Sequence, residues 1–154
     1  QLGRLYLNLL YLDQAEKVLN GAVQMSQVKP KVEKFEDPEK QKVADIKAKV
    51  VKRRNAKAMA AVHSLRGRLY RDRGDMDKMV KAFEDAEAAD KSDPRSLFDL
   101  GMAYGQLSPP KKEQALQKLK GFTSRACASK KAKLYKTQCE QARSMSQRLR
   151  GPGI

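Results

Sequence analysis

The sequence repeats a short pattern at a fixed interval. Residues 66–70 read Arg-Gly-Arg-Leu-Tyr and residues 100–104 read Leu-Gly-Met-Ala-Tyr, so the glycine and the tyrosine both recur after 34 residues. This spacing is the period of an array of helix-turn-helix units, each of which buries its apolar face against the next. A partial third copy, Leu-Gly-Arg-Leu-Tyr, lies at residues 2–6. The pattern therefore predicts a solenoid of packed helices.

The residues between the two complete copies follow the order of such a unit. Gly74 marks a turn, Phe83 and Ala86 follow at helical spacing, and the turn at 91–94 opens the next unit. Together these features resemble the tetratricopeptide repeat family. The resemblance implies an all-α fold, a right-handed helix-turn-helix solenoid of about three repeats. It also implies a protein-binding scaffold, and not an enzyme.

Composition agrees with an all-helical protein. The chain of 154 residues lacks tryptophan, and only 6% of its residues are aromatic. The longest apolar run, residues 5–12, is interrupted by Asn8, so we expect neither a membrane span nor a secretion signal. Because Gln1 is not an initiator and the first copy lacks the start of its helix, we interpret the chain as a fragment or a processed form.

Apolar periodicity and helix breakers divide the chain into five segments. We expect a partial repeat over 1–28, a basic insertion with one extra helix over 29–57, two repeats over 58–130, a capping helix over 131–150 and a tail over 151–154. The first segment is predicted to be a helical hairpin whose second helix is capped by Asp13, and Asp37 before Pro38 is predicted to begin the extra helix. Residues 38–73 form either one long helix or two helices that separate near Asn55.

Charge is distributed unevenly along the chain. The net charge is +15, and two basic segments, 29–71 and 111–154, enclose a slightly acidic block over 72–110. Such asymmetry indicates an acidic partner, which is a protein, a nucleic acid or an anionic lipid surface. A solvated, lysine-rich surface explains the same composition, because exposed helix faces favour lysine.

Residues suited to catalysis or metal binding are scarce. His63 is the only histidine, and its position in the repeat predicts a packed side chain and not a catalytic base. Glu84, Asp85 and Glu87 form a cluster that is expected to face solvent, where the pKa of a carboxyl group is not raised. Two cysteines and one distant histidine do not have the spacing of a zinc site. We therefore predict no catalytic residue, no metal and no cofactor.

A concave groove is the predicted binding site. In the family that the chain resembles, the first helix of each repeat lines this groove, and the resemblance transfers that role to a set of exposed residues. These are Arg4, Asn8, Ser64, Arg68, Arg71, Arg95, Phe98 and Met102. Arginines pair with carboxylates while apolar side chains supply contact area, so the set favours an acidic or amphipathic peptide or helix from a partner protein. Ordinary solvated arginines on helices are the simpler interpretation.

Nucleic-acid binding is the alternative function. The basic segments 40–54 and 130–136 would supply the phosphate contacts of an RNA- or DNA-binding helical module. Neither segment is interleaved with aromatic residues for base stacking. The sequence therefore favours the peptide-binding groove, with nucleic-acid binding as the alternative.

Cys127 and Cys139 lie on either side of a predicted turn between two antiparallel helices. That arrangement would bring them together as a disulfide, which would indicate an oxidising compartment such as a bacterial periplasm or cell envelope. Two reduced, half-buried cysteines in a cytoplasmic protein explain the same residues. The sequence decides neither the redox state nor the oligomeric state.

Overall fold

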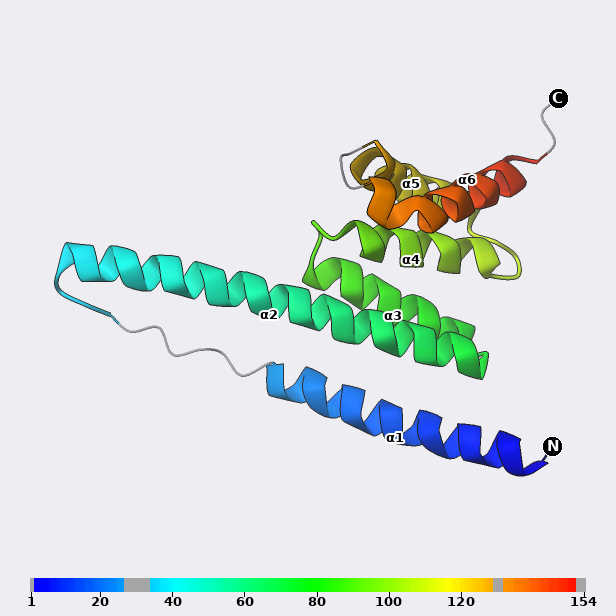
Figure 1. Cartoon of the computed structure of the whole chain (residues 1–154), viewed down its shortest axis with the longest axis horizontal. Helices are drawn as coiled ribbons and strands as arrows, with labels where there is room; N and C mark the ends of the chain where they lie inside the picture. Colours follow the sequence, from blue (N-terminus) through cyan, green and yellow to red (C-terminus); the bar gives the residue numbers. More distant parts are fainter. Residues whose placement is uncertain (1, 27–33, 129–131, 152–154) are drawn as a thin grey trace.

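The computed structural model describes residues 2–26, 34–128 and 132–151, with side chains from Tyr11 onward in the first range. These residues form six α-helices and no strand (Figure 1). The helices are α1 Leu2–Ser26, α2 Pro38–Arg73, α3 Met76–Ala89, α4 Pro94–Gln106, α5 Lys112–Phe122 and α6 Lys136–Arg150. A π-helical turn, Thr123–Cys127, continues α5, and a 3-10 turn, Ala132–Tyr135, precedes α6. The prediction of an all-α fold is confirmed.

Local sequence sets the helix boundaries. Asp37 caps α2, because its carboxylate accepts hydrogen bonds from the backbone amides of Glu39 and Lys40, and Pro38 occupies the first turn. Asp93 and Pro94 begin α4 in the same way. Gly74 ends α2 in the left-handed conformation, with φ of 77°. Glycine reaches this region without steric cost, so the turn before α3 depends on it.

Two helix pairs stack to form the body of the protein. α2 packs on α3 and α4 packs on α5, while α3 also packs on α4, so that consecutive pairs lie side by side (Figure 1). α6 lies against α4 and α5 and closes this end, as predicted for a capping helix. The shared core contains Tyr70, Met79, Phe83, Leu97, Leu100, Tyr104, Leu119, Phe122, Met145 and Leu149.

The repeated glycines lie where helices approach each other closely. A Cβ atom built on Gly101 of α4 would lie 2.8 Å from Leu119 Cγ of α5, which is closer than atoms can pack. The equivalent Gly67 of α2 faces Phe83 of α3. The interval of 34 residues therefore corresponds to a repeated helix contact.

The predicted hairpin at the N-terminus is wrong. Residues 2–26 form one continuous helix, and Asp13 lies inside it instead of capping a second helix. Residues 9–16 contain neither glycine nor proline, so no backbone signal breaks the helix there. The Asp13 carboxylate instead accepts a hydrogen bond from Arg73 of α2. The assignment of residues 1–28 as a partial repeat stays a prediction.

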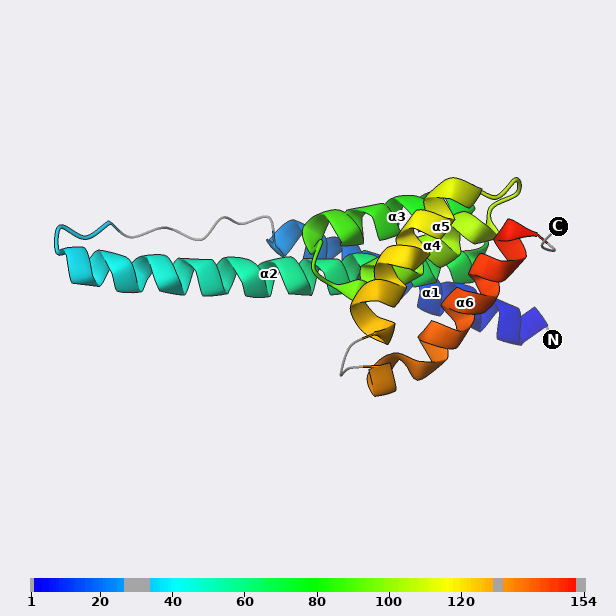
Figure 2. The same cartoon turned by 90° about the horizontal axis from the view of Figure 1, so that it is seen from above.

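Residues 38–73 form a single helix of 36 residues. The expected boundary between residues 57 and 58 therefore lies inside α2, and the extra basic helix is the N-terminal half of this element. That half extends beyond the labelled helices that pack around the C-terminal half (Figures 1 and 2). Within the described parts of the chain, no helix has the length and apolar character needed to cross a membrane.

Candidate peptide-binding groove

An ion pair links α2 to α4. Arg68 of α2 donates to Asp99 of α4, with Nη2 and Oδ2 3.3 Å apart. The Arg68 side chain is 48% exposed, whereas that of Asp99 is only 11% exposed. Burial raises the pKa of the Asp99 carboxyl group, and the charge of Arg68 opposes this shift. Arg68 is therefore exposed, as the sequence pattern predicted, and it also forms an ion pair with α4.

The other two described arginines of the predicted site lie in the electrostatic field of Asp99. The charge of Arg71 also opposes the rise in the Asp99 pKa. Arg95 lies with its guanidinium 5.9 Å from the centre of the Tyr135 ring, and its pKa is raised first by a hydrogen bond to Tyr135 and in smaller part by Asp99. Among the three predicted arginines, Arg68 thus contacts the Asp99 carboxylate, whereas Arg71 pairs with Asp72 and Arg95 lies over Tyr135.

The two apolar members of the predicted site are half-buried. Phe98 and Met102 pack against the core, and the Phe98 ring centre lies 5.1 Å from that of Phe122. Ser64, on α2, is half-buried as well. The side chains of Arg4 and Asn8 lie outside the described residues. We define the groove face by Arg68, Arg71, Arg95, Phe98 and Met102.

A cavity of about 420 Å³ extends the groove face toward the capping helix. It lies between α4 and α6 and is lined by Met102, Gln106, Glu140, Gln141, Ser144, Met145 and Arg148. The predicted site did not include the residues of α6, although their spacing of three and four places them on one side of a helix. This wall carries both an acidic residue, Glu140, and a basic one, Arg148.

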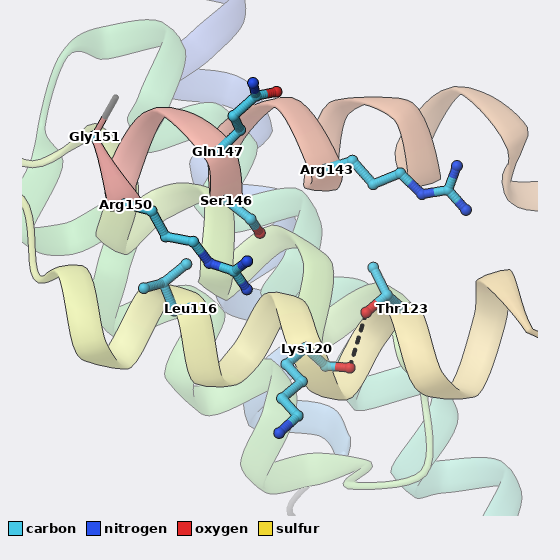
Figure 3. Close-up of a pocket in the computed structure, with 8 residues that line it drawn as sticks. All are labelled: Leu116, Lys120, Thr123, Arg143, Ser146, Gln147, Arg150 and Gly151. Carbon is cyan, nitrogen blue, oxygen red and sulfur yellow. Dashed lines mark hydrogen bonds between the residues drawn. The ribbon is translucent and has the colours of Figure 1, made fainter. Parts of the chain in front are cut away.

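A second groove, of about 480 Å³, lies on the opposite side of α6 (Figure 3). Leu116 of α5 and Thr123 of the π-helical turn form one wall, and Arg143, Ser146 and Arg150 of α6 form the other. Arg150 reaches across toward Leu116, whereas Lys120 and Arg143 extend away from the space between the helices. Because its cations diverge, this groove is less suited than the groove face to hold one anionic group.

His63 is packed, as its place in the repeat predicted. Its ring is 8% exposed, burial lowers its pKa, and Arg66 Nη1 lies 3.4 Å from its Nδ1. The packed imidazole thus lies beside a guanidinium of the same helix. Among the described residues, no group of three or more His, Cys, Asp or Glu side chains could hold a metal ion.

Cys127 and Cys139 are joined by a disulfide in the structure, and their Cα atoms are 5.9 Å apart. The bond connects the π-helical turn after α5 to the first turn of α6. It closes the loop that holds the capping helix beside α5, and therefore supports the wall that α6 contributes to the groove.

Comparison with known families identifies one part of the chain. Residues 60–93 match the family model described as tetratricopeptide repeat. The match begins in the C-terminal half of α2, includes α3 and ends at Asp93, the cap of α4. Searches of curated proteins and of solved structures gave no significant match. The segment 60–93, which includes the C-terminal part of α2 and all of α3, is therefore similar to a tetratricopeptide repeat, as the spacing of the glycines and tyrosines implied.

Proposed function

We propose that this chain is a non-enzymatic scaffold that binds an acidic or amphipathic segment of a partner protein along the groove face. Tetratricopeptide repeats are generally protein-interaction modules, which supports the class of function. The observation that supports the specific proposal is that Arg68 and Arg71 keep about half of their side chains exposed, 48% and 49%, on α2, where Arg68 forms an ion pair with Asp99 of α4.

The groove face offers charge and apolar area to the same ligand. Arg68 and Arg71 pair with Asp99 and Asp72, but their side chains stay 48% and 49% exposed, so partner carboxylates can reach their guanidinium donors for two-pronged hydrogen bonds. Phe98 and Met102 lie half-buried beside them and would lose their remaining exposure under an apolar side chain. Such a surface selects a segment that alternates acidic and apolar residues.

The charge reversal Arg71→Glu tests this proposal. Arg71 forms an ion pair only with its exposed neighbour Asp72 in the described structure, at 3.5 Å, so its replacement disturbs the fold less than a change at Arg68. Selection from a library of random peptides should enrich acidic and apolar residues. We expect Arg71→Glu to weaken the selected peptides at least tenfold, about 1.4 kcal/mol.

The control is Lys52→Glu, which changes the net charge equally on a part of α2 far from the groove face. It should leave the affinity for selected peptides within about twofold of the original. Equal losses from the two variants would overturn the groove assignment. Binding of duplex RNA with a steep salt dependence, together with no peptide enrichment, would favour the nucleic-acid alternative.

A further inference from the structure

The projecting half of α2, residues 38–57, exposes a row of branched aliphatic side chains. Val43, Ile46 and Val50 are 51%, 61% and 46% exposed. Their spacing of three and four residues places them on one side of the helix, as at the a, d and a positions of a heptad. We call these three residues the α2 stripe.

Basic side chains border the α2 stripe on both sides. With Val43 and Val50 at a positions, the neighbouring e and g positions are Lys42, Lys47, Lys49 and Arg54. All four are exposed, and in the described part of the chain none forms an ion pair. Across residues 38–57 as a whole, eight basic residues face only two acidic ones.

The exposed aliphatic residues of the α2 stripe are suited to packing against another helix. Valine and isoleucine favour helix less than alanine or leucine, and the stability of most protein helices comes from packing an apolar face. In Figures 1 and 2 the projecting half has no labelled helix beside it. Its helix-forming lysines and alanines keep it helical, while its aliphatic residues remain available for packing.

We propose that the α2 stripe pairs with an acidic helix of a partner protein in a short coiled coil. The partner carries apolar residues at its a and d positions and glutamates at its e and g positions, because charges at those positions determine which helices pair. Arg53 and Lys57 occupy the next d and a positions, so the apolar seam ends within its second heptad. This surface lies outside the groove face, and its proposed role does not depend on the groove.

The charges distinguish this partner from other occupants. A second copy of the chain would place lysine against lysine at the e and g positions, which disfavours pairing. A membrane-surface helix usually carries large apolar residues such as Trp, Phe or Leu, and the stripe has none. A nucleic acid would bind the basic residues but leave the aliphatic ones exposed to water.

The test uses a synthetic helical peptide of about three heptads, with leucine at a and d and glutamate at e and g. Binding to the full chain is measured by fluorescence anisotropy, and a peptide with lysine at e and g is the control. We expect Lys47→Glu, at an e position, to weaken the acidic peptide at least tenfold. Lys52→Glu, at a c position on the other side of the helix, should change the affinity less than about twofold.

A second matched pair tests the apolar seam. Val50→Asn should weaken the acidic peptide at least tenfold, whereas Val51→Asn, at an exposed b position, should not. Circular dichroism of all variants checks that α2 remains helical. The proposal would be overturned if the two variants of either matched pair weakened the acidic peptide equally. It would also be overturned if anionic vesicles, duplex RNA or the lysine peptide bound more tightly than the acidic peptide.

The two binding surfaces are separable in this experiment. If Arg71→Glu abolishes binding of the acidic peptide and Lys47→Glu does not, the peptide binds the groove face and not the α2 stripe. That result overturns the α2 stripe proposal and leaves the groove proposal standing. If Lys47→Glu abolishes binding and Arg71→Glu has no effect, the stripe proposal stands whatever the outcome for the groove.

Discussion

The ring of Phe83 in α3 lies against the backbone of Gly67 in α2, so closely that a Cβ atom on Gly67 would stand 2.4 Å from Phe83 Cε1. Phe83 is 2% exposed, and its rigid ring has little space into which it could move. We expect Gly67→Ala to separate the two helices and to lower the free energy of unfolding by about 1 to 3 kcal/mol. Urea denaturation monitored by circular dichroism measures this loss.

Gly21→Ala is the control for this prediction. Gly21 lies within α1, and a Cβ atom there would meet nothing within 4 Å. Because alanine favours helix over glycine, the variant should be unchanged or more stable by about 0.5 to 1 kcal/mol. A stable Gly67→Ala protein would show that the close contact between α2 and α3 is not needed.

Glu16 is expected to make the docking of α1 sensitive to acid. Its carboxylate accepts a hydrogen bond from Tyr70 Oη at 2.9 Å, and another from Arg73, and these contacts lower its pKa. A pKa lower in the folded than in the unfolded chain contributes stability above about pH 4.3, which is lost as pH falls through the folded value. Glu16→Gln should therefore be less stable than the original chain at pH 7, and the difference should shrink at pH 3.

Urea denaturation at both pH values measures this difference. Amide hydrogen exchange at pH 7 should also show faster exchange in α1 of Glu16→Gln, while α3 and α4 stay protected. A stability difference that does not depend on pH would contradict the role of the Glu16 charge.

Asp99 is expected to have the opposite pH dependence. Burial raises its pKa, so the folded chain holds this proton more tightly than the unfolded chain does. Folding is therefore penalised as pH rises from about 3.9 through the raised value, and the penalty is relieved as pH falls. Asp99→Asn lacks this ionisation, so its stability relative to the original chain should increase as pH rises across that interval. A relative stability that falls with rising pH would show that Arg68 outweighs burial.

The disulfide between Cys127 and Cys139 is expected to stabilise the chain. The bond closes a loop with a sequence separation of 12 residues, and the chain-entropy model assigns about 3 kcal/mol to a loop of this size. The double variant Cys127→Ser and Cys139→Ser should lose this stability, and dithiothreitol should then have no further effect. Two free thiols per chain in a denaturing, non-reducing titration would contradict this prediction.

Short-range signals predicted much of the fold. Asp37 before Pro38 and Asp93 before Pro94 begin helices where the capping rule places them. The hydrogen bonds of these caps join residues that are close together in the sequence, so the sequence alone reveals them. The glycine of the repeated pattern corresponds to the close contact of Gly101 with α5. The hairpin at Asp13 was wrong because the repeat pattern was imposed on residues whose own preference is helical.

The candidate site was harder to predict from the sequence than the fold, because its chemistry depends on contacts between residues that are distant in the sequence. The position of Arg68 on the first helix of a repeat predicted exposure but not its pairing with Asp99, 31 residues away. The same holds for Arg95, which lies over Tyr135 from another helix. The wall formed by α6 could be predicted only after the disulfide and the packing of Met145 had placed that helix.

Because α2 is unbroken, it fixes the distance and direction between its two ends. Val50 in the α2 stripe and Arg68 on the groove face are 18 residues apart, which corresponds to five helical turns and about 27 Å, so both residues point to the same side. Any partner that contacts both the α2 stripe and the groove face must therefore match this spacing and direction. Two residues inserted after Asn55 would turn the stripe by about 200° relative to Arg68. Each surface would then survive alone, but a single straight partner helix could no longer reach both.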